Sequence, residues 1–340
     1  MDGTSPNKLK VAYLGPMASY SHQAALACFD NEEYLLEAQS QIKDAFAAVQ
    51  AANGSDFAVV PFENSTYGTV VFTLDQFVDQ ESKYPDLLVC GELYLPVHHC
   101  LVGHASKRRS ANLSQEHVWD DDNQMQANCN PKRSSTLMKG LQHVSMIYSH
   151  PAAFGQCEQF LSLYLKGVRK QEVSSTSRAA EMVAEEGPGS RSAAISSSLA
   201  ADIHGLQLLA ESIQDQDDNS TRFFVLKNGK SNPRGLAPSP RQPSNTNGDK
   251  WKTLVSFTLP QQPSGTLAEV LQIFKNHGLN LTSINSRPSL EHTWHYVFLI
   301  EVQGRRDEAD GGAMNQALKE LDTKTKGWKW LGSWRDRSPT

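Results

Sequence analysis

One pattern, repeated four times in the first 200 residues, constrains the fold most. In it, an apolar strand runs into a turn rich in hydroxyl and amide side chains, and a helix follows. The turns span residues 15–22, 61–68, 149–151 and 174–177. Strands alternating with helices predict an open α/β sheet. A helix start carries unpaired backbone N–H groups and the positive end of the helix dipole. Several such starts at one sheet edge would therefore bind a small anionic molecule.

Composition excludes several classes of protein. The 340 residues are 39% hydrophobic and 20% charged, which describes an ordinary globular protein with room for two or three domains. The formal charge is −5 and the chain has no basic arm, so we expect no nucleic-acid partner. We also expect no membrane span and no signal peptide. The five scattered cysteines include no C-x-x-C pair, which favours reduced thiols and a cytoplasmic location.

Hydrophobic periodicity extends the pattern into two lobes. In the first lobe we expect strands at 9–14 and 57–60, and helices at 19–29, 40–53 (capped by Ser40) and about 70–78. An extended stretch at 87–102 follows. In the second lobe we expect strands at 144–148, 168–173 and 192–195. We expect three helices there: one that starts at Pro151, one at 177–186 and a short one that ends at Ile203. Strands near 207–210 and 222–226 are expected to return the chain to the first lobe. Two lobes joined in this way predict a ligand cleft between them.

Two polar segments interrupt the periodic elements. Residues 103–141 lack periodicity and are interpreted as a surface insertion within a first domain spanning 8–227. Residues 228–250 are rich in Pro, Gly, Ser and Asn, as in a linker. Residues 251–334 then follow the order strand, helix, strand, strand, helix, strand, which is typical of a ferredoxin-like unit. We expect it to be a separate small domain.

Five motifs in order carry a family resemblance: YLGPMASYSHQAA (13–25), VVPFENSTYGTV (59–70), YSHPAAFGQC (148–157), SSTSRAA (174–180) and DNSTRFF (218–224). Together they resemble prephenate dehydratase. The segment at 263–289 is similar to the amino-acid-sensing part of ACT regulatory domains. The resemblance implies a two-lobed catalytic domain like a type II periplasmic binding protein, followed by an ACT domain. It also implies conversion of prephenate to phenylpyruvate, water and carbon dioxide in phenylalanine biosynthesis, with no cofactor and no metal.

The resemblance implies catalytic roles for Thr221, Asn64, Gln156 and Glu63. Thr221 would hydrogen-bond the ring hydroxyl of prephenate as that group leaves. The amides of Asn64 and Gln156 would clamp a carboxylate or orient the same hydroxyl. Glu63 would act as an acid beside the dicarboxylate, or it would brace its loop through backbone hydrogen bonds. Orientation is expected to matter more than proton transfer, because losing the hydroxyl and CO2 leaves an aromatic ring.

A second set of residues is implied to bind the substrate: Ser149, Ser21, His22, Ser174, Ser175, Thr176, Arg222 and Phe223. Helix capping is the ordinary alternative for the hydroxyl residues, and packing for His22. Strand alternation points Arg222 away from Thr221. Arg222 is therefore either a structural ion-pair partner or, if the strand bends, a carboxylate ligand. Whether His22 or Glu63 transfers a proton stays open.

The ACT segment is implied to bind an amino acid effector through these residues: Gly265, Thr266, Leu267, Asn280, Asn285, Ser286, Arg287 and Pro288. Two positions depart from the family pattern, which has Ala in place of Thr266 and Glu in place of Asn285. Loss of that glutamate charge leaves L-phenylalanine as the expected effector and another aromatic amino acid as the alternative. We expect a homodimer or homotetramer that pairs through the ACT domains.

Two other functions stay open. Arogenate dehydratase differs only in the side-chain group of its substrate, and a non-catalytic amino acid sensor would share the two-lobed fold. The Thr221-Arg222-Phe223 motif weighs against a sensor, which has no need of it. The run His98-His99-Cys100 suggests metal ligands, but in a strand His99 would face away from the other two, so no metal is expected.

Overall fold

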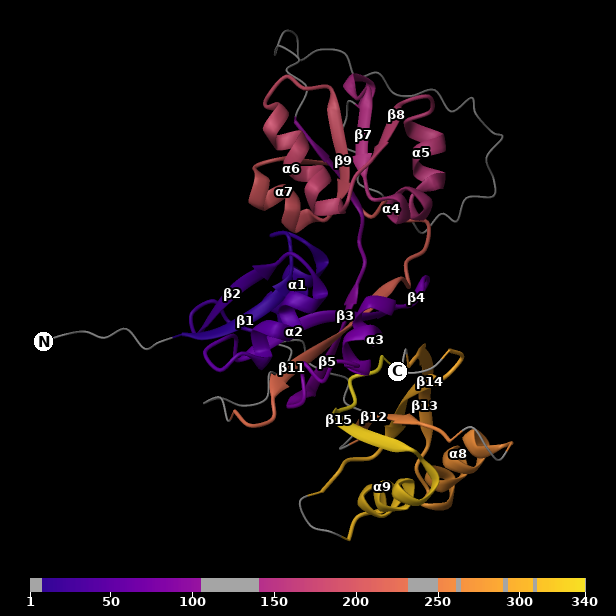
Figure 1. Ribbon diagram of the computed structural model, residues 1–340. Helices are drawn as coiled ribbons and strands as arrows, with labels where there is room; N and C mark the ends of the chain where they lie inside the picture. The colour runs from indigo at the N-terminus through magenta and orange to yellow at the C-terminus, as the bar shows by residue number, and fades with distance from the viewer. Residues whose placement is uncertain are drawn as a thin grey trace, which may run out of the picture. The chain divides into compact units, whose positions relative to one another are not determined.

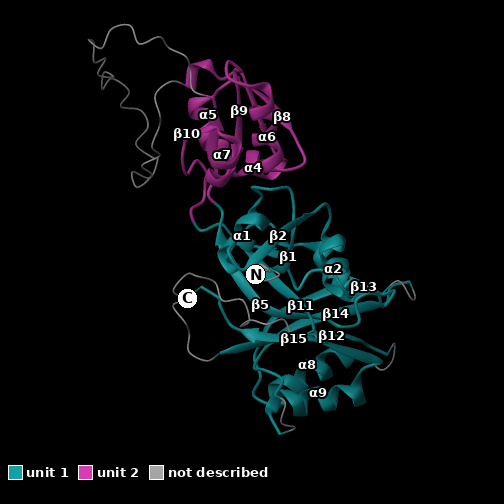
Figure 2. Ribbon diagram, turned by 90° about the vertical axis from the view of Figure 1, so that its left-hand side faces the viewer, with its two compact units in different colours: residues 1–97, 218–340 teal, residues 98–217 magenta. Residues whose placement is uncertain are grey.

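The computed structural model describes residues 8–104, 141–231, 250–260, 264–289, 293–307 and 311–339. The chain forms two compact units, residues 1–97 with 218–340 and residues 98–217, shown in teal and magenta in Figure 2. Most of the predicted insertion and linker lies outside the described residues. Within the described ranges, no helix is both long and apolar enough to cross a membrane.

The first unit contains a mixed sheet with the order β2-β1-β3-β11-β5, to which β4 adds beside β3 (Figure 1). The bounds of its strands are β1 Leu9–Leu14, β2 Tyr34–Gln39, β3 Phe57–Asn64, β4 Gly68–Thr69, β5 Leu87–Pro96 and β11 Ser220–Asn228. β1 runs parallel to β2 and β3, whereas β11 is antiparallel to β3 and β5. Its helices are α1 Tyr20–Cys28, α2 Ile42–Gln50 and α3 Val71–Val78. The predicted mixed α/β fold is confirmed.

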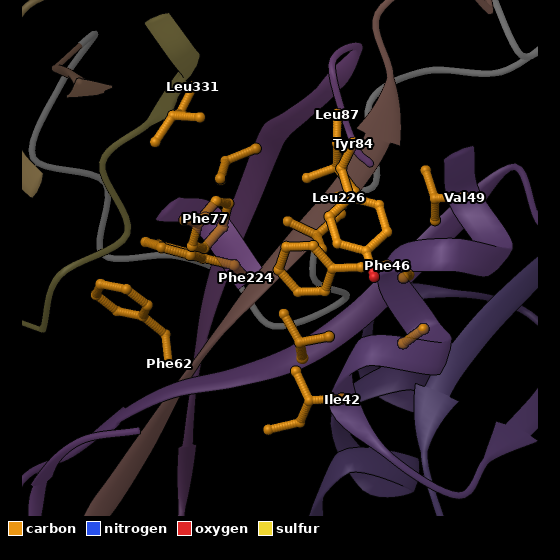
Figure 3. Packing of buried hydrophobic residues seen from close by; sticks show 14 of the residues in the cluster. Ile42, Phe46, Val49, Phe62, Phe77, Tyr84, Leu87, Phe224, Leu226 and Leu331 are labelled. Atoms are coloured by element: carbon orange, nitrogen blue, oxygen red, sulfur yellow. The ribbon is translucent and has the colours of Figure 1, made fainter. Parts of the chain in front are cut away.

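β11 lies at the centre of the core because both of its faces are apolar. Phe223 and Val225 pack with α1 on one face. Phe224 and Leu226 pack with α2 and α3 on the other, where Figure 3 shows Phe46 and Phe77 around Phe224. A strand buried on both sides reads as a continuous apolar run, and FFVL is such a run.

The second unit is built on the sheet β10-β6-β9-β7-β8. Its strands are β6 Cys100–Gly103, β7 Met146–Ser149, β8 Arg169–Glu172, β9 Ser192–Ser196 and β10 Gln207–Ala210. Its helices are η1 Leu141–His143 (a 3-10 turn), α4 Pro151–Gln156, α5 Glu158–Tyr164, α6 Thr176–Glu186 and α7 Ser198–His204. β7 is parallel to β8 and β9, so α4 and α6 begin after the carboxyl ends of two adjacent parallel strands.

The C-terminal segment is ferredoxin-like, as predicted. Its elements are β12 Trp251–Thr258, α8 Thr266–Asn276, β13 Leu281–Pro288, β14 Tyr296–Gln303, α9 Ala313–Lys324 and β15 Gly327–Arg335. The sheet order is β13-β14-β12-β15, with every pair antiparallel. Both helices cover one face of this sheet (Figure 1).

The other face of the C-terminal sheet shares a core with the first lobe. Leu254, Leu299, Leu331 and Trp334 belong to the same buried cluster as the α2 and α3 side chains, and Figure 3 shows Leu331 in this group. The rings of Trp334 and Phe224 lie 5.1 Å apart. Strand alternation explains both contacts: Val255 and Ile300 face α8 and α9, while their neighbours Leu254 and Leu299 face the lobe.

Three local predictions were wrong. The turn at 61–68 forms a hairpin, because β3 continues to Asn64 and pairs with β4; the helix predicted at about 70–78 is present as α3 and begins only at Val71. The stretch 87–102 is extended, as predicted, and forms β5 and β6, but β10 pairs with β6 in the second unit instead of returning to the first. α2 is capped by Gln41, not Ser40, through a capping box with Asp44. β2 was not predicted, and its residues are half-buried or exposed.

Candidate active site

Thr221 and Asn64 lie opposite each other on the antiparallel pair β11 and β3. Asn64 Nδ2 donates to Thr221 Oγ1 at 3.0 Å and to Asn219 Oδ1 at 2.9 Å. Ser65 Oγ donates to the same Asn219 oxygen at 3.4 Å and accepts from the Ser220 N–H at 3.0 Å. These four side chains, Thr221, Asn64, Ser65 and Asn219, are called the Thr221 cluster below. Residues distant in sequence are thus brought together by strand pairing.

Hydrogen bonds at both the oxygen and the nitrogen of the Asn64 amide determine its orientation. Its Oδ1 accepts the backbone N–H groups of Thr66 and Tyr67, each at 3.0 Å, so the side chain builds the turn that follows it. Its Nδ2 therefore faces Thr221. Because Thr221 Oγ1 accepts this hydrogen bond, the hydroxyl's own proton is left to donate to a ligand, and an accepted bond strengthens a hydroxyl as a donor.

Arg222 points to the opposite side of β11 and is held by carboxylates. Its Nε donates to Glu92 Oε2 at 2.8 Å, it also pairs with Glu301, and its side chain is only 6% exposed. Burial alone would lower the pKa of Arg222, but the coulombic attraction of Glu92 and Glu301 outweighs burial and raises it. Of the two interpretations left open by the sequence, the structure shows the ion pair.

Glu63 lies at the edge of this charged group. Its carboxylate is 3.9 Å from Arg222 Nη1, and its side chain is 41% exposed. Within the described residues its side chain makes no hydrogen bond to the backbone, so the bracing contacts considered from the sequence are not seen. Its backbone is instead held by the pairing of β3 with β4, where it lies opposite Thr69.

The first turn is organised around the start of α1. Ser19 is the N-cap: its Oγ accepts the His22 N–H at 3.2 Å and donates to Leu14 O at 3.0 Å. His22 Nδ1 accepts the Ala18 N–H at 3.1 Å, and its ring stacks on Tyr13. Burial lowers the pKa of His22, which keeps the imidazole neutral. The neighbouring Ser21 is buried.

Gln156 belongs to the second unit, at the C-terminal end of α4. Its Oε1 lies 2.5 Å from His99 Nε2, and its backbone carbonyl accepts the Asp215 N–H at 2.6 Å. Gln156 thus lies in the second unit and the Thr221 cluster in the first. The cleft expected between the two lobes stays a prediction.

The predicted substrate-binding hydroxyls of the second unit have different environments. Ser149 is buried and its Oγ donates to Ile195 O at 2.9 Å; the N-cap of α4 is His150 rather than Ser149. Ser175 caps α6 by accepting the Arg178 N–H at 3.0 Å, while Ser174 is exposed and Thr176 half-buried. In the first unit, the Phe223 side chain is part of the core.

Three of the predicted effector residues contact the first lobe. Thr69 Oγ1 donates to Asn285 Oδ1 at 3.0 Å, Arg287 Nε donates to Asp75 Oδ1 at 2.6 Å, and Gln80 Nε2 donates to Pro288 O at 3.1 Å. Asn280 and Ser286 are exposed on or beside β13. The remaining three lie at the start of α8: Gly265 has a φ of +91°, Thr266 is buried and Leu267 is half-buried.

A surface hollow lies elsewhere in the C-terminal segment. It is lined by Lys250, Trp251, Gln303, Gly304, Arg305 and Arg335, and it contains none of the predicted site residues. In the described part of the chain, no cluster of three or more His, Cys, Asp or Glu side chains could hold a metal ion.

Five residues that hold these groups were not predicted from the sequence: Ser65, Asn219, His99, Glu92 and Glu301. Asn219 stands inside the DNSTRFF motif and was passed over in favour of its neighbours. His99 was weighed only as a metal ligand. Glu92 and Glu301 each interrupt an otherwise apolar strand, LLVCGELYLP and YVFLIEVQ. An isolated carboxylate in such a strand signals a buried ion pair, because a lone charge is too costly to bury.

A sequence model described as prephenate dehydratase matches residues 11–231. The chain belongs to the prephenate dehydratase family. This family of hydro-lyases was predicted from the five motifs, and the match covers the Thr221 cluster, Gln156 and the α1 turn. A second model, described as the ACT domain, matches residues 253–311.

Named relatives agree with this membership. The bifunctional chorismate mutase/prephenate dehydratase of Aquifex aeolicus is 35% identical over 96% of this chain and 74% of its own length. The prephenate dehydratase of Bacillus subtilis is 30% identical over 94% of this chain and 96% of its own length.

Solved structures share the architecture. Prephenate dehydratase from Arthrobacter aurescens, in complex with L-Phe, has a TM-score of 0.72 and 25% identity, covering 98% of this chain and 92% of its own. GqqA, described as a novel type of quorum quenching acylase, has a TM-score of 0.69 and 25% identity, covering 97% of this chain and 98% of its own.

Proposed function

We propose that this prephenate dehydratase family member converts prephenate to phenylpyruvate, water and carbon dioxide, with the Thr221 hydroxyl acting on the departing ring oxygen. The observation that carries the proposal is the hydrogen bond from Asn64 Nδ2 to Thr221 Oγ1. It leaves the hydroxyl proton of Thr221 as the donor for substrate. A neutral donor suits this reaction, because it stabilises charge that develops only in the transition state.

The reaction needs alignment more than strong acid–base chemistry. As the bond between the ring and its carboxylate breaks, the electron pair enters the ring and the ring hydroxyl is expelled. The carboxylate leaves as CO2, and a proton from solvent completes the water molecule. The ring becomes aromatic, which makes the reaction downhill. Holding the breaking C–C bond perpendicular to the ring plane lowers the barrier to the step.

Asn64 acts in this proposal by holding Thr221. Its two N–H protons already face three acceptors, namely Thr221 Oγ1, Asn219 Oδ1 and the Ser220 carbonyl at 3.2 Å. A substrate carboxylate would have to displace one of them. We propose that the substrate is also contacted by other predicted residues, namely Gln156, Ser149, Ser21 and residues 174–176.

We also propose L-phenylalanine as the effector of the ACT segment. The Arthrobacter aurescens structure, which holds L-Phe, supports this choice. Asn285 contacts Thr69, and Thr69 lies opposite Glu63 on the β3–β4 pair that precedes α3. A ligand bound at residues 285–288 would therefore act on the strand pair that carries Asn64.

We also propose the domain limits, the oligomeric state and the cellular location of the protein. We propose a catalytic domain at 8–227, a linker at 228–250 and a regulatory domain at 251–334, supported by the two matched ranges. We further propose a homodimer or homotetramer in the cytoplasm. Size-exclusion chromatography with light scattering tests the assembly.

The activity is tested by incubating the purified protein with prephenate and, separately, with arogenate. Phenylpyruvate formed from prephenate, read by its absorbance in alkali, is the expected result. Phenylalanine formed from arogenate, with no turnover of prephenate, would favour arogenate dehydratase. Amino acid binding without turnover of either substrate would favour the sensor. Adding L-phenylalanine, L-tyrosine or L-tryptophan to the active assay then identifies the effector.

A further inference from the structure

His99 and Gln156 form a side-chain pair within the second unit. His99 is 2% exposed, and its Nε2 lies 2.5 Å from Gln156 Oε1. An amide oxygen can only accept, so Nε2 carries the proton and donates it. The tautomer of the histidine and the orientation of the glutamine amide are thereby determined together.

The surroundings of His99 keep the imidazole neutral. Burial lowers its pKa, the hydrogen bond to Gln156 opposes this effect, and the nearby His98 adds to it. Gln214 also faces this group: its Oε1 accepts the His99 backbone N–H at 3.0 Å, and its Nε2 donates to His98 Nδ1 at 3.4 Å. A neutral imidazole has one N–H group, and here Gln156 receives it.

The backbone around the pair is held by the two segments that connect the units. The Ile213 N–H donates to His99 O at 2.9 Å, and the Asp215 N–H donates to Gln156 O at 2.6 Å. His99 is on the outgoing segment and residues 213–215 are on the returning one. α4, which carries Gln156, is thus tied to both segments.

Because Gln156 Oε1 accepts the hydrogen bond from His99, the N–H2 group of the same amide remains available to donate to a ligand. Within the described residues, Gln156 Nε2 makes no hydrogen bond, and the side chain is only half-buried. We propose that His99 is a positioning residue for the dehydratase reaction, which orients the Gln156 amide so that its N–H2 group meets the substrate. The proposal rests on the function proposed above.

Orienting this side chain in advance has a clear physical benefit. A glutamine has several rotamers of similar energy, and ordering it at the moment of binding costs conformational entropy. The buried His99 fixes the side-chain rotamer of Gln156 when the protein folds, so the amide is already oriented when the substrate binds. Misplacing one oriented group by about 1 Å lowers turnover by up to about 100-fold.

The test compares kcat for prephenate in His99→Leu, His99→Gln, Gln156→Leu and the double variant His99→Leu with Gln156→Leu. We expect His99→Leu to lower kcat by about 10-fold to 100-fold with a smaller change in KM. His99→Gln, whose amide N–H2 replaces the Nε2 donor, should recover most of the loss. The double variant should be no slower than Gln156→Leu alone, because His99 acts only through Gln156. Gln159→Leu, at an exposed position of the neighbouring helix α5, is the control for the glutamine substitution and should leave kcat unchanged.

Several results would overturn this role. Equal kcat losses in His99→Leu and His99→Gln would contradict it. So would kcat losses that multiply in the double variant, or an unchanged kcat in His99→Leu. If His99→Leu does not fold, the wild-type imidazole can be read by long-range 1H–15N NMR, where a proton on Nδ1 alone, or a charged ring at neutral pH, contradicts the proposal. Absence of any turnover by the wild-type protein would instead overturn the proposed function itself, and the two failures are therefore distinct.

Discussion

Arg222 of β11 and Glu301 of β14 form an ion pair whose side chains are almost completely buried. The pair links the strand that carries Thr221 to the sheet of the ACT segment. Lys252 approaches the same two carboxylates, Glu92 Oε1 at 3.3 Å and Glu301 Oε1 at 3.4 Å, and also Asp336 Oδ1 at 3.2 Å. Two buried cations, Arg222 and Lys252, thus share three carboxylates whose side chains are at most 9% exposed, at the junction between the lobe and the ACT sheet.

Glu301→Gln should lower the free energy of unfolding by about 3–5 kcal/mol, because it leaves Arg222 and Lys252 buried with too few negative partners. Urea unfolding measures the change. Glu320→Gln is the matched control on the same segment, since Glu320 pairs with His277 at the surface and should cost under about 1 kcal/mol. Similar losses for both variants would contradict a special role for the buried cluster.

Gly332→Ala should be strongly destabilising. Gly332 has a φ of +127°, and a Cβ there would lie 2.1 Å from Val89 O of β5. The combined strain and overlap predict a loss of about 2–5 kcal/mol in unfolding free energy. At Gly327, where a Cβ meets nothing within 4 Å, the same substitution should change stability by less than about 0.5 kcal/mol. A tolerated Gly332→Ala would mean that β15 does not approach β5 so closely.

Removing the chain from Trp251 onward should destabilise the first lobe. A separate module would leave a stable, active remainder, but Leu254, Leu299, Leu331 and Trp334 share the core of α2 and α3. Each large apolar side chain withdrawn from that core forfeits about 1.5–3 kcal/mol of burial. We expect the truncated protein to aggregate or to lose cooperative unfolding by circular dichroism. A monodisperse truncated protein with wild-type kcat would contradict the shared core.

Thr221→Ala should lower kcat by about 100-fold to 1000-fold while changing KM far less, because the hydroxyl is proposed to act on charge that develops in the transition state. Thr221→Ser retains the hydroxyl and should keep most of the activity. Steady-state kinetics with prephenate measure both variants. Parallel losses in kcat and in substrate affinity, or an inactive serine variant, would indicate a structural role.

Stability should fall as the pH drops below about 6.5, in part because of His99. Burial lowers the pKa of His99 in the folded protein, so the unfolded chain binds more protons between that lowered pKa and the ordinary one. Free energies of unfolding measured from pH 7.5 to 5.5 should decline less steeply in His99→Gln, which cannot take up this proton. Identical slopes would mean that His99 does not titrate differently on unfolding.

Much of the fold was accessible from local pattern. The apolar run FFVL predicted the buried strand β11, and the strand–helix order predicted the ferredoxin-like unit. The 61–68 turn was misread because a hydroxyl-rich turn suits a hairpin as well as a helix start. Its outcome depended on Asn64 Oδ1 bonding the backbone of Thr66 and Tyr67. Such a bond cannot be seen in residue types alone.

Residue order and periodicity were enough to predict the α/β class and the ferredoxin-like order of the C-terminal segment, and the resemblance of the five motifs predicted the family and the roles of Thr221, Asn64 and Gln156. Packing between distant parts of the chain decided the rest. Arg222 meets a carboxylate 79 residues away, Gln156 meets His99, and Leu331 joins a core built by α2 and α3. Helical and strand periods reflect only neighbouring residues, whereas the partner of a buried charge or amide depends on which strands pair and which sheets pack. That information exists only once the chain has folded.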